Sequence, residues 1–174
     1  MSELANDTVP GLSAKVVHLW KIPLAESAPQ GIDLDLPELL AADELTRYRR
    51  ISHSRARSEY LRSRVALRLV LASYLECQAN TISFSYNEYG KPELAENKLP
   101  NLHFNLSHSG DYCVLAVTAE HEVGIDIERC QAGRDYTALA QRFFSVAEHQ
   151  LLESMADEVL FYRMWVLKEA AVKS

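Results

Sequence analysis

The chain has 174 residues, of which 48% are hydrophobic, and this is enough for an ordinary globular domain with a core. It has no apolar run of about 18 residues, which excludes a membrane-spanning helix, and Met1–Asp7 lacks the features of a signal peptide. We therefore expect a cytoplasmic protein that does not bind membranes. The net charge of −6 argues against a nucleic-acid binder, and three scattered cysteines argue against a disulfide framework.

The first part of the chain predicts one strand followed by two helices. Val16–Trp20 is rich in β-forming residues and predicts a short strand. Apolar residues at helical spacing predict a helix over Pro37–Ile51 and a longer one over Ser54–Glu76.

Strands and turns dominate the middle of the chain, and helices dominate its last part. We expect strands at Ile82–Tyr86, Leu102–Leu106, Tyr112–Thr118 and Val123–Glu128, with turns at Asn87–Pro92 and Ser107–Asp111. The expected helices are Tyr136–Phe143, Val146–Met155 and Glu158–Lys173. Strands and helices in mixed blocks, without regular βαβ alternation, predict an α+β fold with an antiparallel sheet.

A block of arginines is the first unusual feature. Between Arg47 and Arg68 there are eight arginines, and only Glu59 opposes them within the block. In an otherwise acidic protein, such a block indicates either a local anion site or a solvated helix face.

Two carboxylates two residues apart are the second feature. In a strand, Asp126 and Glu128 point to the same side, opposite to Val123, Ile125 and Ile127. A divalent cation relieves the repulsion between such a pair, and hard oxygen ligands suit Mg²⁺ or Mn²⁺. An ordinary strand with a solvated acidic face fits the same pattern.

Two further segments carry polar side chains that could bind an anionic substrate. Phe104–Ser109 ends in hydroxyls and an imidazole, which suits a phosphate cradle or an ordinary hydrogen-bonded turn. Glu169 and Lys173 are four residues apart on a helix, which suits an ion pair or a third metal-binding carboxylate beside lysines. Ser145 and Glu148 have the spacing of a capping box, so Glu148 need not be catalytic.

Taken together, the motifs resemble those of the phosphopantetheinyl transferases of the surfactin-synthetase-activating type. The resemblance covers about Asp43 to the end of the chain and includes the G-I-D-I-E and W-x-x-K-E-A-x-x-K signatures. The matching segments, in family order, are Arg49-Arg50, Tyr89–Pro92, Phe104–Ser109, Val123–Glu128, Arg142–Ser145 with Glu148, and Trp165–Lys173.

The resemblance implies transfer of phosphopantetheine from coenzyme A to a serine of an acyl or peptidyl carrier protein, with release of adenosine 3′,5′-bisphosphate. It implies that Asp126, Glu128 and Glu169 hold Mg²⁺, or Mn²⁺ in its place. Glu169 is the candidate general base, directly or through a metal-bound water. No covalent enzyme intermediate is required, which agrees with the lack of a convincing nucleophile.

The resemblance also implies the contacts to coenzyme A. His108 falls on the histidine that contacts the phosphates, with Ser107 beside it, and Lys91 resembles a contact to the adenine nucleotide. Arg47 would supply charge near the 3′-phosphate, although Glu44 stands in a stretch where the family often has lysines. Lysines 168 and 173 would stabilise charge on the departing phosphate, as His108 could.

The family fold consists of two similar α/β halves around a pseudo-twofold axis, each with an antiparallel sheet and a long helix. We assign 1–121 to the first half and 122–174 to the second, which would be incomplete, and expect a monomer. We also expect the chain to be a truncated form, less stable and less active than a longer one. Two alternatives are a non-catalytic module that binds coenzyme A or a carrier protein, and a Mg²⁺-dependent phosphoesterase.

Overall fold

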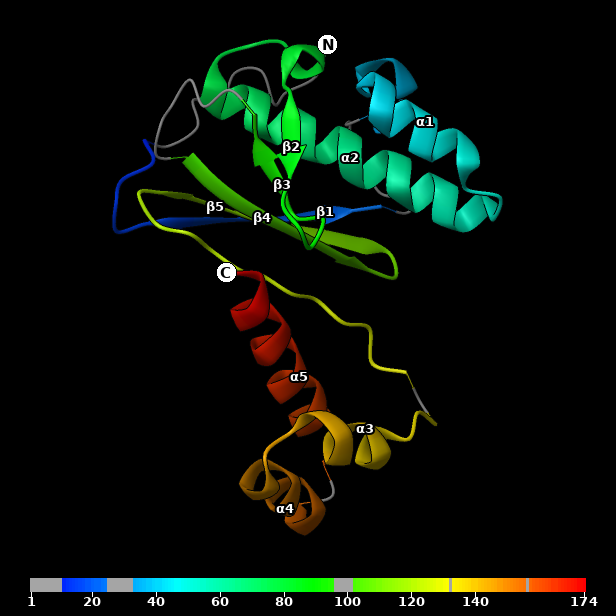
Figure 1. The fold of residues 1–174 in the computed structure, drawn as a ribbon, viewed down its shortest axis with the longest axis vertical. Coiled ribbons are helices and arrows are strands. Elements are labelled where there is room, and N and C mark those ends of the chain that lie inside the picture. The colour runs from blue at the N-terminus through cyan, green and yellow to red at the C-terminus, as the bar shows by residue number, and fades with distance from the viewer. Residues whose placement is uncertain (1–10, 25–32, 96–101, 132, 156) are drawn as a thin grey trace.

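The computed structural model describes residues 11–24, 33–95, 102–131, 133–155 and 157–174. It confirms the α+β class, with antiparallel sheets and several helices (Figure 1). The main sheet has the strand order β1-β5-β4, and its elements are β1 (Val17–Pro23), β4 (Leu102–Ser109) and β5 (Tyr112–Ala119). The strands at both edges pair antiparallel with the central strand β5.

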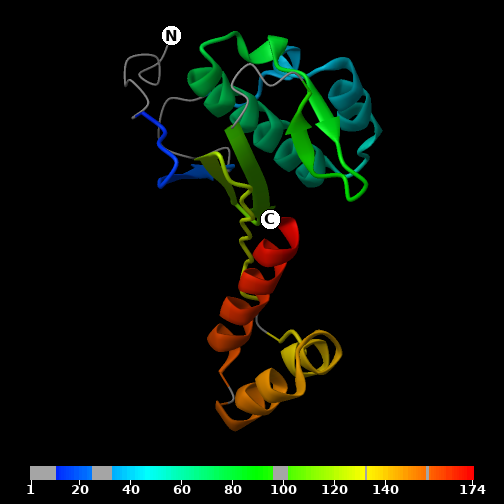
Figure 2. The ribbon, with the colours of Figure 1, turned by 60° about the vertical axis from the view of Figure 1, so that its left-hand side comes forward.

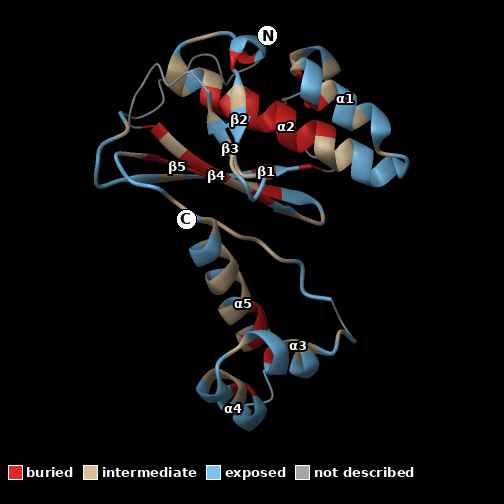
Figure 3. Cartoon of the chain, viewed as in Figure 1, coloured by how far each residue is buried: buried red, intermediate tan, exposed pale blue. Residues whose placement is uncertain are grey.

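The long α2 (Ser54–Leu75) covers one face of this sheet and crosses it in Figure 1. The shorter α1 (Ala42–Arg50) packs against α2. The main core lies between α2 and the sheet, where Leu67 and Leu71 are fully buried against residues such as Leu115 and Phe104. The middle of α2 is buried at nearly every position, from Leu61 to Arg68 and at Val70 and Leu71 (Figure 3).

A small hairpin packs beside α2. It consists of β2 (Phe84–Tyr86) and β3 (Pro92–Leu94), and the ring of Phe84 contacts Phe104 of the main sheet. The predicted turn between the two strands is confirmed, because the side-chain amide oxygen of Asn87 accepts hydrogen bonds from the backbone N–H groups of residues 89 and 91.

The last part of the chain forms three helices, α3 (Tyr136–Phe143), α4 (Val146–Met155) and α5 (Glu158–Lys173), with the predicted bounds. They have a small core of their own around Phe161, which is 1% exposed. Figures 1 and 2 show these helices standing apart from the sheet, with only the end of α5 reaching it. Among the described residues, no helix has the length and apolar character needed to cross a membrane.

The predicted helix over Pro37–Ile51 is broken into two pieces. A 3-10 helix covers Pro37–Leu39, and α1 begins only at Ala42, after two residues with extended backbone. The reason is that the Glu44 carboxylate accepts a hydrogen bond from the backbone N–H of Ala41, at 3.0 Å. This bond satisfies a free donor at the start of α1 and fixes the helix start there.

Two predictions about extended segments are wrong. Residues 107–109 belong to β4, so the turn begins only at Gly110, which has a φ of +59°. Val123–Glu128 is not a strand: no other described strand lies beside it with a backbone ladder. Its contacts to β4 are made through side chains instead. Side chains of β4, and not a backbone ladder, thus hold this segment.

Candidate active site

The segment from residue 123 to residue 129 runs along β4 on the face opposite α2. Alternate residues of β4 bind it: the Asn105 amide oxygen accepts from the Ile125 N–H, and the Ser107 hydroxyl donates to Asp126 Oδ1, both at 2.8 Å. Further along, the Ser109 hydroxyl donates to Glu128 at 3.2 Å. The two carboxylates therefore do lie on one side of their segment, as the sequence predicts, although no strand is formed.

Asp126 is the most enclosed charged group of this cluster. Its side chain is 5% exposed, and its Oδ1 atom accepts hydrogen bonds from Ser107 and from the Lys173 ammonium, the latter at 2.5 Å. Its Oδ2 atom is buried and has no hydrogen-bond partner among the described residues. A buried carboxylate oxygen without a partner is costly, so this atom is the natural place for a ligand to bind.

Close backbone packing brings Lys173 to Asp126. A Cβ atom added at Gly124 would lie 1.8 Å from the carbonyl oxygen of Ala170 in the last turn of α5. Only glycine allows α5 to approach the segment so closely. The glycine of the G-I-D-I-E signature therefore positions the lysine of the second signature next to the aspartate.

Lys91 reaches the same place from the β2–β3 turn. Its ammonium donates to the backbone carbonyl of Lys173 at 2.6 Å. A cation at the carboxyl end of a helix also interacts favourably with the helix dipole. The sites predicted at Lys91, Asp126, Ser107 and Lys173 are thus joined in one chain of contacts, although they come from four separate segments.

Glu169 is not part of this group. Among the described residues, no three His, Cys, Asp or Glu side chains are arranged to hold a metal ion. Glu169 is half-buried on α5 and, within the described part of the chain, forms no hydrogen bond or ion pair with Asp126 or Glu128. Its roles as third metal ligand and as general base stay predictions.

Lys168 points into the helical part of the molecule. Its ammonium lies 2.9 Å from a carboxylate oxygen of Glu148 in α4 and 5.3 Å from the centre of the Phe144 ring. Glu148 also forms the predicted capping box with Ser145, accepting from its N–H at 2.7 Å. The hydrogen bond from Lys168, together with those from Ser145, lowers the pKa of Glu148 to about 2. The structure therefore places Lys168 in the contact between α4 and α5, apart from Lys173.

Two other predicted contacts to coenzyme A also lie apart from Asp126. His108 is exposed and, as the neighbour of Ser107 in a strand, points to the opposite face of β4. Arg47 is exposed on α1, with its guanidinium carbon 5.4 Å from the centre of the Tyr60 ring. Their roles stay predictions.

Four of the eight arginines of the block bind acidic side chains, so this half of the block is not an open anion site. Arg64 and Arg68 are buried and bind Glu44, and Arg62 binds Asp35 and the carbonyl of Leu24. Arg55 pairs with Glu59 and lies 3.4 Å from Asp111, a further acidic partner outside the block. Apart from Glu59, these acidic partners lie outside the block, which is why the charge count within the block missed them.

Asn105 and Ser109 were missed as site residues. A signal for them exists, because every second residue from 103 to 109 of β4 is polar: His103, Asn105, Ser107 and Ser109. This alternation indicates a polar sheet face that needs polar partners.

Two models of known protein families together match all the segments that form this site. A family model described as 4′-phosphopantetheinyl transferase, N-terminal, matches residues 33–120, and one described as the 4′-phosphopantetheinyl transferase superfamily matches residues 122–174. The chain belongs to the 4′-phosphopantetheinyl transferase superfamily. The second match begins just before the Gly124–Glu128 segment and includes all of α5.

The family includes enzymes from bacteria and animals. The chain is 38% identical to the 4′-phosphopantetheinyl transferase HetI of Nostoc, over 91% of this chain and 68% of the relative. It is 34% identical to the 4′-phosphopantetheinyl transferase Ffp of Bacillus subtilis, over 79% and 61% of the two chains. It is 37% identical to the human L-aminoadipate-semialdehyde dehydrogenase-phosphopantetheinyl transferase, over 64% and 40%. The chain thus spans between 40% and 68% of these relatives' lengths.

Proposed function

We propose that this chain transfers 4′-phosphopantetheine from coenzyme A to a serine of an acyl or peptidyl carrier protein and releases adenosine 3′,5′-bisphosphate. The observation that supports this most is the buried carboxylate of Asp126, with one oxygen bound by Lys173 and Ser107 and the other without a partner. The chain's membership of the transferase family also supports a transfer reaction at such a site.

Mg²⁺ is the proposed metal, with Mn²⁺ as a substitute. Mg²⁺ commonly takes one or two protein carboxylates and completes its shell with water and substrate phosphates. Asp126, through its free Oδ2 atom, and Glu128 fit this need without Glu169, which we retain as a proposed third ligand. When bound, the cation would offset the negative charge of the pyrophosphate group of coenzyme A.

The lysines near Asp126 would bind and orient the anionic substrate. Lys173 is one-third exposed and Lys91 lies against it, so both ammonium groups can reach a phosphate at this spot. We propose that His108 and Arg47 contact other parts of coenzyme A, and that Lys168 acts through the packing of α5. The carrier serine hydroxyl would attack the β-phosphorus, the bond to the bridging oxygen would break, and Glu169 would take the serine proton.

A single incubation separates this proposal from its alternatives. The chain is mixed with coenzyme A and Mg²⁺, with and without an apo carrier protein, and both proteins and nucleotides are analysed by mass spectrometry. We expect the carrier to gain one phosphopantetheine and adenosine 3′,5′-bisphosphate to appear only with the carrier. Binding of coenzyme A without transfer would instead support a binding module, and cleavage without a carrier would support a phosphoesterase.

A further inference from the structure

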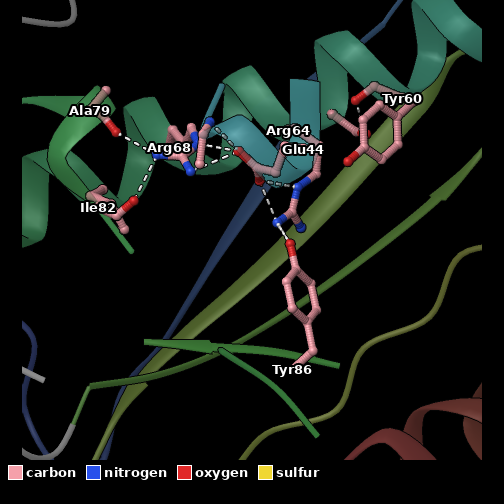
Figure 4. Close-up of polar contacts among 9 residues, drawn as sticks. Glu44, Tyr60, Arg64, Arg68, Ala79, Ile82 and Tyr86 are labelled. Carbon is pink, nitrogen blue, oxygen red and sulfur yellow. Dashed lines mark hydrogen bonds and ion pairs between the residues drawn. The ribbon is translucent and has the colours of Figure 1, made fainter. Parts of the chain in front are cut away.

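A buried charged cluster of Glu44, Arg64 and Arg68 lies between α1 and α2 (Figure 4). The side chain of Glu44 is 1% exposed, and those of Arg64 and Arg68 are 9% and 0% exposed. Buried ion pairs seldom stabilise a fold more than apolar side chains of similar size would. The main effect of this cluster is therefore to fix the positions of the elements that it joins.

Glu44 joins the start of α1 to the middle of α2. One carboxylate oxygen accepts from Arg64 Nε at 2.6 Å. The other accepts from Arg68 Nε at 2.7 Å and from the backbone N–H of Ala41 at 3.0 Å. Two donors from α2 and one from the residue before α1 converge on this carboxylate, so neither helix can rotate or slide without breaking a charge-assisted bond.

The two arginines extend the cluster to the β2–β3 hairpin. Arg68 donates to the backbone carbonyls of Ala79 and Ile82, both at 2.9 Å, in the segment that leads into β2. Arg64 donates to the hydroxyl of Tyr86, the last residue of β2, at 2.8 Å. Figure 4 shows Glu44 between the two arginines, with Tyr86 on the far side of Arg64. These bonds hold the hairpin against α2, the helix on which α1 also packs.

Two proposed contacts to coenzyme A lie at the ends of this cluster. Arg47 stands one helical turn after Glu44 on α1. Tyr86 pairs with Pro92 across the hairpin, and Lys91 immediately precedes Pro92. Arg47 and Lys91 are far apart in the sequence. Arg47 is three residues from Glu44, and Lys91 is next to Pro92, the strand partner of the cluster residue Tyr86.

We propose that Glu44 is a positioning residue for coenzyme A binding, which sets the spacing between Arg47 on α1 and Lys91 on the hairpin through Arg64 and Arg68. The inference rests on the proposed function, since it assigns Glu44 a task only if the chain binds coenzyme A. Glu44 faces inward and orients basic residues, and it does not itself contact the substrate.

The test is the Glu44→Gln variant, which keeps the size of the side chain but removes the charge that both arginines bind. We expect the KM for coenzyme A to rise about ten-fold, the order that follows from losing one charge-assisted hydrogen bond. The kcat should change less than about three-fold, because no group at Asp126 is altered. The matched control is Asp35→Asn, which removes the carboxylate partner of Arg62 on the same helix and should leave the KM unchanged.

A purely structural role gives a different result. Loss of folded protein lowers the apparent kcat and leaves the KM for coenzyme A unchanged, and that outcome would overturn the inference. If the wild-type chain transfers nothing, the proposed function fails, and calorimetry with coenzyme A decides the inference instead. A ten-fold weaker Kd for Glu44→Gln supports it, whereas equal affinity, or no binding by the wild type, overturns it.

A second variant covers the case in which Glu44→Gln does not fold. Tyr86→Phe removes only the hydroxyl that binds Arg64 and keeps the ring. We expect it to raise the KM for coenzyme A about three-fold in the wild-type background and not at all in a Lys91→Ala background, as for two residues that act through one another. The same rise in both backgrounds would show that Tyr86 does not act through Lys91.

Discussion

Asp126 concentrates the chemistry of the candidate site because its two carboxylate oxygens have different surroundings. Lys173 and Ser107 bind Oδ1, and Oδ2 is buried without a partner among the described residues. The ammonium of Lys173 binds one carboxylate oxygen, and the other oxygen remains open to a cation. A buried oxygen without a partner is a suitable ligand for such a cation.

Replacing Asp126 by Asn should weaken metal binding. The amide removes the charge and leaves a poorer ligand, and loss of a direct ligand should cost at least the ten-fold or so that loss of a supporting residue costs. The measurement is Mn²⁺ binding by electron paramagnetic resonance in the presence of coenzyme A. Asp111→Asn, on the exposed β4–β5 turn, is the control, and equal Mn²⁺ affinity in the wild type and Asp126→Asn would contradict the assignment.

Glu148 predicts a pH dependence of stability. Its pKa in the folded protein is lowered to about 2 from the ordinary value of 4.5. The hydrogen bond from Lys168 is the largest cause, and the hydrogen bonds from Ser145 come next. The charged form is therefore favoured by folding: its stabilising effect is present above about pH 4.5 and is lost as the pH falls towards 2. In melting curves, Glu148→Gln should lower the Tm at pH 6, and the difference from the wild type should shrink between pH 4.5 and 2. A constant difference over that range would disprove it.

At the level of single residues, the sequence predicted partners only where they are close in the chain. The capping box at Ser145 and Glu148 was visible, because its spacing is local. The partners of Arg64 and Arg68 were not, because Glu44 lies 20 or more residues away and reaches them only through the packing of α1 on α2. Charge counts in a sequence window cannot reveal such pairs.

At the level of elements, the approach of α5 to residues 123–128 depends on one missing side chain. The Ala170 carbonyl oxygen would be 1.8 Å from a Cβ atom at position 124, and backbone cannot move aside as a flexible side chain can. The contact carries Lys173 and, through the Lys173 carbonyl, Lys91. This contact between Gly124 and the end of α5 thus connects the sheet with the C-terminal helices.

Gly124→Ala should separate the end of α5 from residues 123–128. We expect the last turn of α5 to move away, the Lys173–Asp126 ion pair to break, and transfer activity to fall at least about ten-fold, since overpacking costs about 1–3 kcal/mol. Hydrogen exchange at residues 170–173 should also become faster. Gly11→Ala, where an added Cβ meets nothing within 4 Å, is the control. Unchanged activity and exchange would rule out this role of Gly124.

The prediction of a strand at Val123–Glu128 failed for a physical reason. Its alternation of apolar and polar residues fits a strand, but a strand also needs a neighbour that supplies backbone hydrogen bonds. Here Asn105, Ser107 and Ser109 bind the segment with their side chains. The alternation still put both carboxylates on one side, so the site residues were predicted correctly as neighbours despite the wrong secondary structure.

At the level of the whole molecule, the described residues form two separate cores. One lies between α2 and the main sheet, and the other is a small aromatic cluster around Phe161 within α3–α5. Figure 3 shows most buried residues in the first part and few in the second. We propose that the boundary lies near residue 121, as the sequence suggested.

The two cores should open independently. A small core gives little protection, so backbone amides of α3–α5 should exchange faster than those in the buried turns of α2 and in β5. Phe161→Ala should widen the difference by about 3–5 kcal/mol, because it empties the centre of the smaller core. Hydrogen exchange followed by mass spectrometry measures this. Equal protection of both parts, lost together in the variant, would show a single cooperative unit.

The helices of the second part were predicted from apolar spacing with their observed bounds, and local capping fixes where they begin. Asp135 and Asp157 accept hydrogen bonds from backbone N–H groups at the starts of α3 and α5, and Ser145 does so for α4. What the sequence could not show is the arrangement of these helices, since Lys168 and Lys173 lie on one helix but contact different parts of the molecule.

The central claim is that the cluster of Asp126, Ser107 and Lys173 carries out phosphopantetheine transfer in this chain. The most direct test is the intact mass of an apo carrier protein after incubation with coenzyme A, Mg²⁺ and either the wild type or Asp126→Asn. We predict that the wild type adds one phosphopantetheine to the carrier serine and that the variant adds none in the same time. A carrier that is unmodified by the folded wild type, or equally modified by both proteins, would contradict the account.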